Sequence, residues 1–203
     1  MPLSEFGAKS MSLLIKNVFM RKRTPTLLMF IYLLLPFVTR AQSKDLKIIL
    51  IRHAEKPGNG DNLNCQGLNR SLALPAVLFK KFGRPEKVYI PTIATGSVTK
   101  HVRMLQTVSP FVIKYGLSLN SAFDVNDAKG VATSLIRDNG TILIVWEHQE
   151  LVPIISYLGV DTKKIKWPPD DFDTIWIVTF KKGRAIFTTD KESLSPRYDC
   201  PIL

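Results

Sequence analysis

Two of the three histidines in the chain stand in matching positions, and their surroundings mark a candidate site. His53 follows the apolar segment 46–51, with Arg52 directly before it, and His148 follows a second apolar segment, 141–146. An imidazole can act as a nucleophile or exchange a proton near neutral pH, and a guanidinium binds anionic groups. A single histidine at the end of a strand is more often structural. Two of them in matching positions, one beside an arginine, favour a functional site.

The elements that must position these residues are buried strands. Segments 46–51 and 141–146 contain consecutive isoleucine, leucine and valine residues, the pattern of strands buried on both faces. Because strands alternate with helical segments along the chain, the sequence predicts a three-layer α/β/α sandwich with a mostly parallel central sheet. Ligands of such sheets bind at the carboxyl ends of the strands. Helices are expected at 66–82, 99–108, 128–137 and 150–158, and further strands at 87–90, 117–119, 174–180 and 185–189.

The order of several motifs resembles the histidine phosphatase superfamily, also called phosphoglycerate mutase-like. Its first signature, an apolar strand ending in Arg-His-Gly or Arg-His-Ala, is matched by residues 49–56, Ile-Leu-Ile-Arg-His-Ala-Glu-Lys. Its second, a helix with arginine, Gln-Thr and proline, is matched by residues 103–110, Arg-Met-Leu-Gln-Thr-Val-Ser-Pro. Its third is the strand that leads to His148, and residues 67–71 are similar to the family's G-x-x-R-A segment. The resemblance covers residues 46 to about 189.

This resemblance implies a role for each matched residue. His53 would attack phosphorus to form a phosphohistidine, which divides one hard displacement into two easier ones. Arg52 and Arg103 would hold the phosphoryl oxygens with bidentate guanidinium groups, and His148 would donate to the same group. Water then hydrolyses the intermediate, so the resemblance implies neither metal nor cofactor. It also implies a small phosphorylated substrate.

The resemblance does not identify the acid that protonates the leaving group. One branch of the family has Asp directly after the second histidine, where this chain has Gln149. The mutase-like branch takes a Glu from the segment after the second arginine, where the nearest carboxylates here are Asp124 and Asp127. For Asp127, the interpretation as a helix N-cap is slightly favoured over a role as the general acid.

Other carboxylates near the site also compete for this role. Strand alternation predicts that Glu147 faces away from His148, and helical spacing places His101 on a different side from Arg103, at the surface. Aromatic residues Trp167 and Phe172 are expected at the mouth of the pocket. The identity of the acid stays open among Asp124, Asp127, Glu147, Glu150 and Glu55.

The first 41 residues have the pattern of a secretory signal peptide. A basic cluster, 21–23, precedes a 12-residue apolar run, 27–38, and small residues precede a cleavage position after Ala41. The run is too short for a membrane span, which needs about 20 residues. Met20 is an alternative start, which would make residues 1–19 an upstream extension. We therefore expect an exported protein, periplasmic or secreted, with no membrane span after cleavage and one domain over residues 42–203.

Composition and charge limit the function further. The 203 residues are 45% hydrophobic and 22% charged, which is typical of a globular protein. The net charge of +11 falls to +6 when residues 1–41, with six basic residues and one acidic residue, are removed. This moderate surplus suits an anionic small substrate, and no nucleic-acid-binding motif is present. The spacing of Cys65 and Cys200 fits no zinc-binding pattern. The sequence is compatible both with a disulfide between them and with two free thiols.

The sequence therefore predicts an exported, metal-independent phosphomonoesterase that acts through a phosphohistidine. A non-catalytic phosphoester-binding protein is the first alternative, because the family's acid is not found after His148. A phosphohistidine-directed signalling phosphatase is the second. The substrate and the oligomeric state are not determined by the sequence.

Overall fold

The two apolar segments form the middle strands of a six-stranded sheet in the computed structural model, which describes residues 45–200. The sheet order is β3-β2-β4-β1-β5-β6. Neighbours among β1 to β4 are parallel, whereas β5 is antiparallel to β1 and β6 to β5. The bounds are β1 (Lys47–Arg52), β2 (Lys87–Tyr89), β3 (Leu119–Asn120), β4 (Thr141–Trp146), β5 (Thr174–Lys181) and β6 (Arg184–Lys191).

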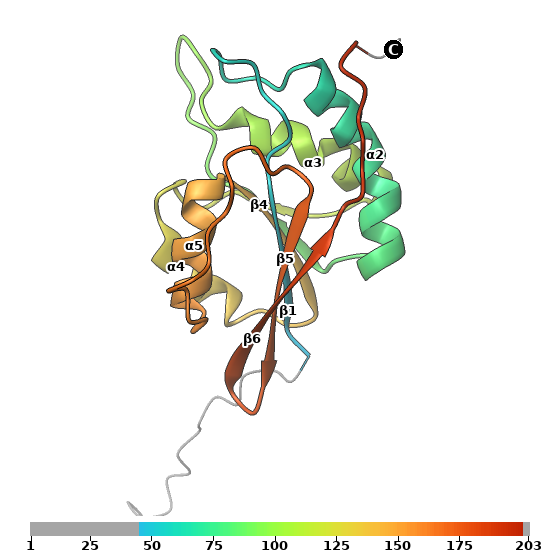
Figure 1. Cartoon of the computed structure of the whole chain (residues 1–203). Coiled ribbons are helices and arrows are strands. Elements are labelled where there is room, and N and C mark those ends of the chain that lie inside the picture. Colours follow the sequence, from blue (N-terminus) through green and yellow to red (C-terminus); the bar gives the residue numbers. More distant parts are fainter. Residues whose placement is uncertain (1–44, 201–203) are drawn as a thin grey trace, which may run out of the picture. The chain divides into compact units, whose positions relative to one another are not determined.

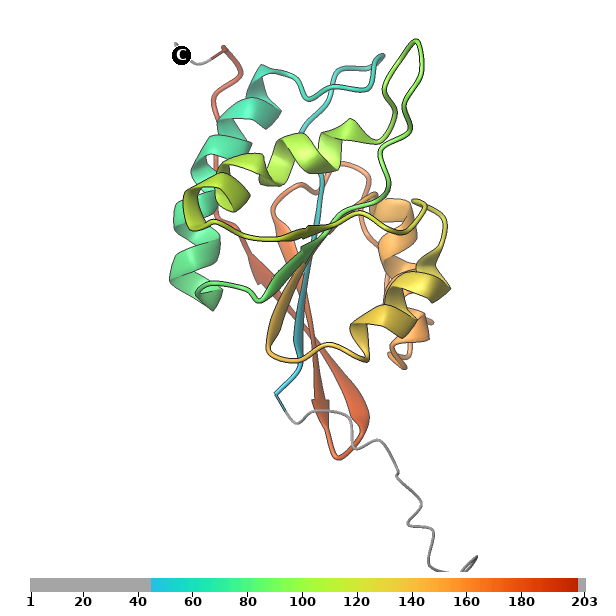
Figure 2. The same cartoon turned by 180° about the vertical axis from the view of Figure 1, so that it is seen from behind.

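Helices cover both faces of this sheet (Figures 1 and 2). The even-numbered residues of β1, such as Ile48 and Leu50, pack with the helices α4 and α5, and the odd-numbered Ile49 and Ile51 pack with α2 and α3. Both sets are fully buried, which explains why β1 is apolar on both faces from Ile48 to Ile51. The predicted three-layer α/β/α fold is confirmed. The helices are α2 (Cys65–Phe82), α3 (Val102–Tyr115), α4 (Ala128–Leu135) and α5 (His148–Tyr157).

Two helices differ from the sequence prediction at their ends. Helix α3 continues through Pro110 to Tyr115, although proline cannot donate to the carbonyl four residues earlier. That carbonyl, of Gln106, instead accepts a hydrogen bond of 2.8 Å from the Ser71 hydroxyl on α2. Helix α5 begins at His148 rather than at residue 150, so His148 lies in the first turn of a helix.

Several predictions concern residues outside the described part of the chain. The signal peptide over 1–41, its cleavage position and the alternative start at Met20 all fall there. The described residues all belong to one compact unit of the chain, residues 40–203. Within residues 45–200, no helix is both long and apolar enough to cross a membrane.

A disulfide joins Cys65, the first residue of α2, to Cys200, 135 residues later in the sequence. The C-terminal segment that leads to Cys200 runs alongside α2 (Figure 1). The side-chain amide of Asn69 donates to the carbonyls of Arg197 and Asp199, at 3.0 and 2.7 Å. The disulfide and these hydrogen bonds hold the end of the chain against α2.

Reduction of this disulfide is expected to lower the free energy of unfolding by about 2–5 kcal/mol, because the bond closes a long loop in the unfolded chain. Urea denaturation with and without reductant, with thiols counted in each sample, measures the difference. The double variant Cys65→Ser/Cys200→Ser should unfold at one urea concentration in both conditions. Coincident curves for oxidised and fully reduced wild type would contradict the prediction.

Candidate active site

The carboxyl ends of β1 and β4 place both candidate histidines at one edge of the sheet. The strands are parallel and in register, with Arg52 opposite Trp146. The His53 amide extends this pairing by donating to the Trp146 carbonyl at 3.1 Å. His148 follows two residues later, at the first turn of α5. Pairing of the two central strands therefore brings together the residues that the sequence analysis selected at their ends.

Arg52 is a buried cation whose side chain is held by the segment before β5. Its Nη1 donates to the carbonyls of Pro169 and Asp171, at 2.5 and 3.1 Å. The guanidinium carbon lies 3.9 Å from the centre of the Phe172 ring, a cation–π contact. Burial lowers the pKa of Arg52 to about 10, so the group still carries its charge at neutral pH. These contacts fix the guanidinium and leave its Nε without a partner.

His53 is buried, with only 3% of its surface exposed. Its Nδ1 lies 2.7 Å from the Ala54 carbonyl, and the ring centre lies 6.2 Å from that of Phe172. Burial lowers the pKa of His53 to about 4, and the charges of Arg103 and Arg52 act in the same direction. The ring is therefore neutral at pH 7. When its Nδ1 donates to the carbonyl, the lone pair is on Nε2, as a nucleophile requires.

Arg103 and His148 come from the first turns of two helices. Arg103, near the N-terminus of α3, donates from Nη1 to the Gly60 carbonyl at 3.3 Å. Its Nη2 lies 3.5 Å from Glu147 Oε1, at the N-cap of α5. Burial and the charge of Arg52 lower the pKa of His148, so this imidazole is also neutral at pH 7. Helix N-termini carry a partial positive charge, which adds to that of the arginines.

Three buried nitrogen atoms in this group lack a hydrogen-bond partner. They are Arg52 Nε, Arg103 Nε and His148 Nδ1. Among the described residues, no other buried side-chain nitrogen or oxygen lacks a partner. Buried donors are normally paired, because leaving one unpaired costs about 1–3 kcal/mol. All three belong to the residues matched to phosphate-binding positions. The cations at this end of the sheet therefore keep hydrogen-bonding capacity that the protein itself does not use.

The first and second motifs support each other through side-chain contacts. The Ala54 amide donates to Thr107 Oγ1 at 2.9 Å, and the Leu63 amide donates to Gln106 Oε1 at the same distance. The Gln-Thr pair of the second motif therefore holds the chain that follows His53. The glycine of segment 67–71 has an equally direct role, because a Cβ at Gly67 would lie 2.2 Å from the Glu55 carbonyl oxygen.

Four of the five candidate acids have other partners, among them Glu147, which lies beside Arg103. Glu55 accepts hydrogen bonds of 2.9–3.0 Å from the buried guanidinium of Arg70. Asp127 caps α4 by accepting from the Gly130 amide at 2.8 Å, as the sequence ranking favoured. Asp124 accepts from the Asn126 amide. Glu150 lies in the first turn of α5, where burial and the charge of Glu147 raise its pKa.

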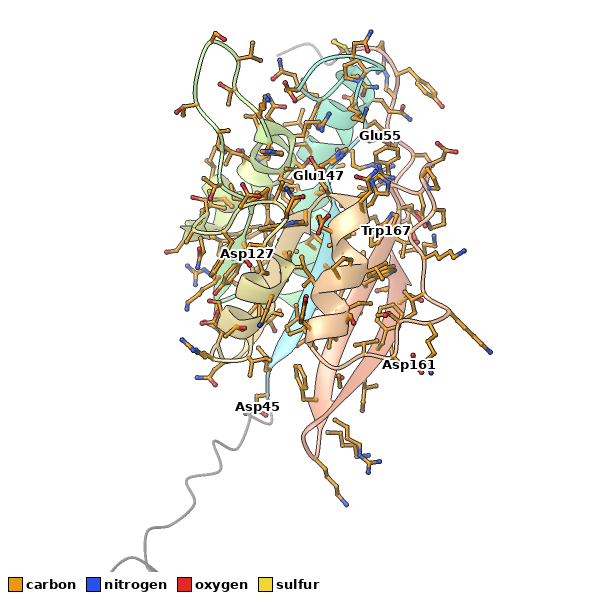
Figure 3. The ribbon with its side chains drawn as sticks, turned by 90° about the vertical axis from the view of Figure 1, so that its left-hand side faces the viewer. Asp45, Glu55, Asp127, Glu147, Asp161 and Trp167 are labelled. Carbon is orange, nitrogen blue, oxygen red and sulfur yellow. A yellow bond between two sulfur atoms is a disulfide. The ribbon has the colours of Figure 1, made fainter. Side chains whose placement is uncertain are left out.

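The predictions for Glu147 and His101 were wrong. Strand β4 ends at Trp146, so strand alternation does not extend to Glu147, and its carboxylate lies beside Arg103. Glu147 and Glu55 lie at the same end of the described unit, opposite Asp45 and Asp161 (Figure 3). His101 precedes α3 rather than lying within it, and its Nδ1 is 3.5 Å from Glu147 Oε1. No local sequence signal predicted this contact between two helix ends.

Within residues 45–200, no group of three or more His, Cys, Asp or Glu side chains is placed to hold a metal ion.

A buried ion cluster lies behind the site and joins three parts of the chain. The guanidinium of Arg70 contacts Glu55 at 2.9 Å and Glu192, just after β6, at 2.5 Å. Asp173 lies 4.0 Å away. Burial raises the pKa of Glu192 to about 7, because Arg70, already paired with Glu55, offsets only part of the penalty for burying a second carboxylate.

Comparison with known proteins connects this arrangement to a fold family. Sequence comparison gives no match to a protein-family model or to a curated protein. Structural comparison matches SixA of Agrobacterium tumefaciens at a TM-score of 0.53 and 14% identity, covering 73% of this chain and 99% of SixA. The protein histidine phosphatase SixA complexed with tungstate also matches at 0.53, with 15% identity and coverage of 72% and 97%.

A phosphoserine phosphatase variant from Entamoeba histolytica, solved with phosphoserine, matches at a TM-score of 0.50 and 14% identity, covering 72% of this chain and 96% of that chain. The described chain therefore shares the phosphoglycerate mutase-like fold of these phosphatases, the fold that the sequence motifs implied.

The raised pKa of Glu192 predicts a pH-dependent contribution to stability. The folded chain holds a proton that the unfolded chain releases between about pH 4.5 and 7, so stability is lost as the pH rises through this range. Glu192→Gln cannot ionise, so its free energy of unfolding relative to wild type should rise by about 1–3 kcal/mol from about pH 5 to about pH 8. Urea denaturation at each pH measures this change.

Asp190→Asn is the matched control, because Asp190 is paired with Lys81 at the surface and its pKa is lowered. Its difference from wild type should stay constant over the same range. A Glu192→Gln difference that is also independent of pH would contradict the prediction.

Proposed function

We propose that this protein is a metal-independent phosphomonoesterase that acts through a phosphohistidine on His53. The observation that carries the proposal is the set of unpartnered buried nitrogens on Arg52, Arg103 and His148. The buried ring of His53 lies among these groups and is neutral, because burial and the charges of Arg103 and Arg52 lower its pKa. The shared fold with histidine phosphatases supports the same assignment.

The proposed reaction uses these residues in two steps. His53 Nε2 attacks phosphorus in line with the leaving oxygen, and water later attacks phosphorus, so that the P–N bond breaks and His53 is released. Arg52 and Arg103 bind the phosphoryl oxygens, whose charge must be held in both transition states. The carbonyls of Pro169 and Asp171 orient Arg52 before substrate arrives, which reduces reorganisation during the reaction.

We further propose a small phosphate ester outside the cytoplasm as the substrate. The signal-peptide pattern over residues 1–41 and the net charge of +6 that remains without them support this part of the proposal. The disulfide between Cys65 and Cys200 is compatible with an oxidising compartment.

Phosphate release from a panel of aryl and sugar phosphates, with chelator present, tests the proposal. Wild type should release phosphate, and His53→Ala should lower kcat/KM by at least about a thousandfold because it removes the nucleophile. Arg137→Ala is a control, since this exposed arginine precedes β4 at the opposite edge of the sheet. It should retain wild-type activity.

Other outcomes would identify the alternatives. A thermal shift with vanadate but no release from any ester would favour a non-catalytic phosphoester-binding protein. Release from a phosphohistidine peptide alone would favour the signalling phosphatase, whose leaving group needs little protonation. Full activity in His53→Ala would contradict the proposed site.

A further inference from the structure

His101 precedes α3 and does not cap it. Its backbone, with φ 59° and ψ 19°, lies in the left-handed region, which few residues other than glycine adopt but which asparagine, aspartate and histidine adopt more often than most. Side chains at the N-cap position usually accept a hydrogen bond from the helix, but the His101 side chain makes no such bond. The imidazole has other contacts instead.

The imidazole lies against the carboxylate of Glu147. His101 Nδ1 is 3.5 Å from Glu147 Oε1, and the same oxygen is 3.5 Å from Arg103 Nη2. Glu147 also occupies an N-cap position, that of α5, and its side chain does not cap the helix either. Both side chains are partly exposed, His101 by 26% and Glu147 by 21%. Two residues at helix starts thus meet beside Arg103, one of the residues assigned to phosphate in the proposed function.

This pair has the properties required for protonating a leaving group. Glu55 is bound to Arg70, and Asp127 caps α4, so neither carboxylate is available without breaking those contacts. The Glu147 carboxylate already faces the guanidinium of Arg103, with Oε1 3.5 Å from Nη2. Imidazole is the side chain that ordinarily exchanges a proton near neutral pH. A carboxylate next to Nδ1 orients the ring so that Nε2 can exchange that proton.

We propose that His101, oriented by Glu147, is the proton donor to the leaving group of the phosphomonoesterase reaction, in place of a carboxylic acid. This inference rests on the proposed function. As His53 Nε2 bonds to phosphorus and the ester P–O bond breaks, the departing oxygen takes the proton from His101 Nε2. In the second step, His101 Nε2 takes a proton from water as the water oxygen bonds to phosphorus and the P–N bond breaks. His53 and the donor form of His101 are thereby restored.

The test is the dependence of kcat/KM on the leaving group. Wild type and variants are compared on 2,4-dinitrophenyl, 4-nitrophenyl, phenyl and glycerol phosphates, in order of increasing need for protonation. His101→Asn keeps a side chain that tolerates the left-handed backbone but cannot donate as an acid. It should lose about 10²- to 10⁴-fold on glycerol phosphate and less than about threefold on 2,4-dinitrophenyl phosphate.

Two further variants separate the roles of the neighbouring carboxylates. Glu147→Gln should show the same selectivity with a smaller loss, about tenfold on glycerol phosphate, because it leaves the donor in place but less well oriented. Glu150→Gln tests the remaining candidate acid in the first turn of α5, and it should match wild type on every ester when His101 is the donor. Asp161→Asn, at the end of the described unit opposite Glu147, is the control.

Several results would overturn the inference. An equal loss by His101→Asn on all four esters would mean that His101 only supports the site, and no loss would mean that it has no role. A selective loss by Glu147→Gln or Glu150→Gln with His101→Asn unchanged would make a carboxylic acid the donor. Each of these leaves the proposed function standing, whereas a wild type that hydrolyses no ester would overturn both.

Discussion

The pairing of β1 with β4 is the constraint on which the rest of the structure depends. Both strands are buried on both faces, and a slip of one residue would turn every side chain to the wrong layer. Register is therefore determined by hydrophobic packing, with Arg52 opposite Trp146. Because the strands are parallel, the polar residues that follow each of them meet at one edge. The location of the site is a consequence of how the core packs.

Placing cations at that edge requires compensation from other parts of the chain. Arg52 obtains it from two backbone carbonyls and an aromatic face in the segment before β5. These contacts are incomplete, since nitrogens of Arg52, Arg103 and His148 remain without partners. Under the proposed function, these cations are already in place before an anionic group arrives. Burial keeps the ring of His53 neutral, and the charges of Arg103 and Arg52 add to that effect.

A second buried charge cluster maintains the position of the loop that follows His53. Arg70 on α2 connects Glu55 with Glu192, which comes from the other end of the chain. The disulfide at Cys65 ties the C-terminal segment to the start of the same helix. Such a cluster adds little net stability, because burying its charges is costly. Its contacts are directional, however, and they determine where the chain around the nucleophile lies.

Hydrophobic patterning by itself predicted the layers, the central strands and the two histidines at their ends, because a strand that is buried on both faces consists of consecutive apolar residues. Arg103 was found through a motif, and its position relative to His53 required the fold. The contacts of His101 and Glu147 were decided only by tertiary structure, since β4 ends at Trp146 and His101 adopts a left-handed backbone before α3. The carbonyls that hold Arg52 and the pairing of Cys65 with Cys200 were likewise decided by the fold. Every residue has a backbone carbonyl, so the sequence does not mark the ones that hold Arg52. Contacts between residues more than 100 positions apart depend on how whole elements pack.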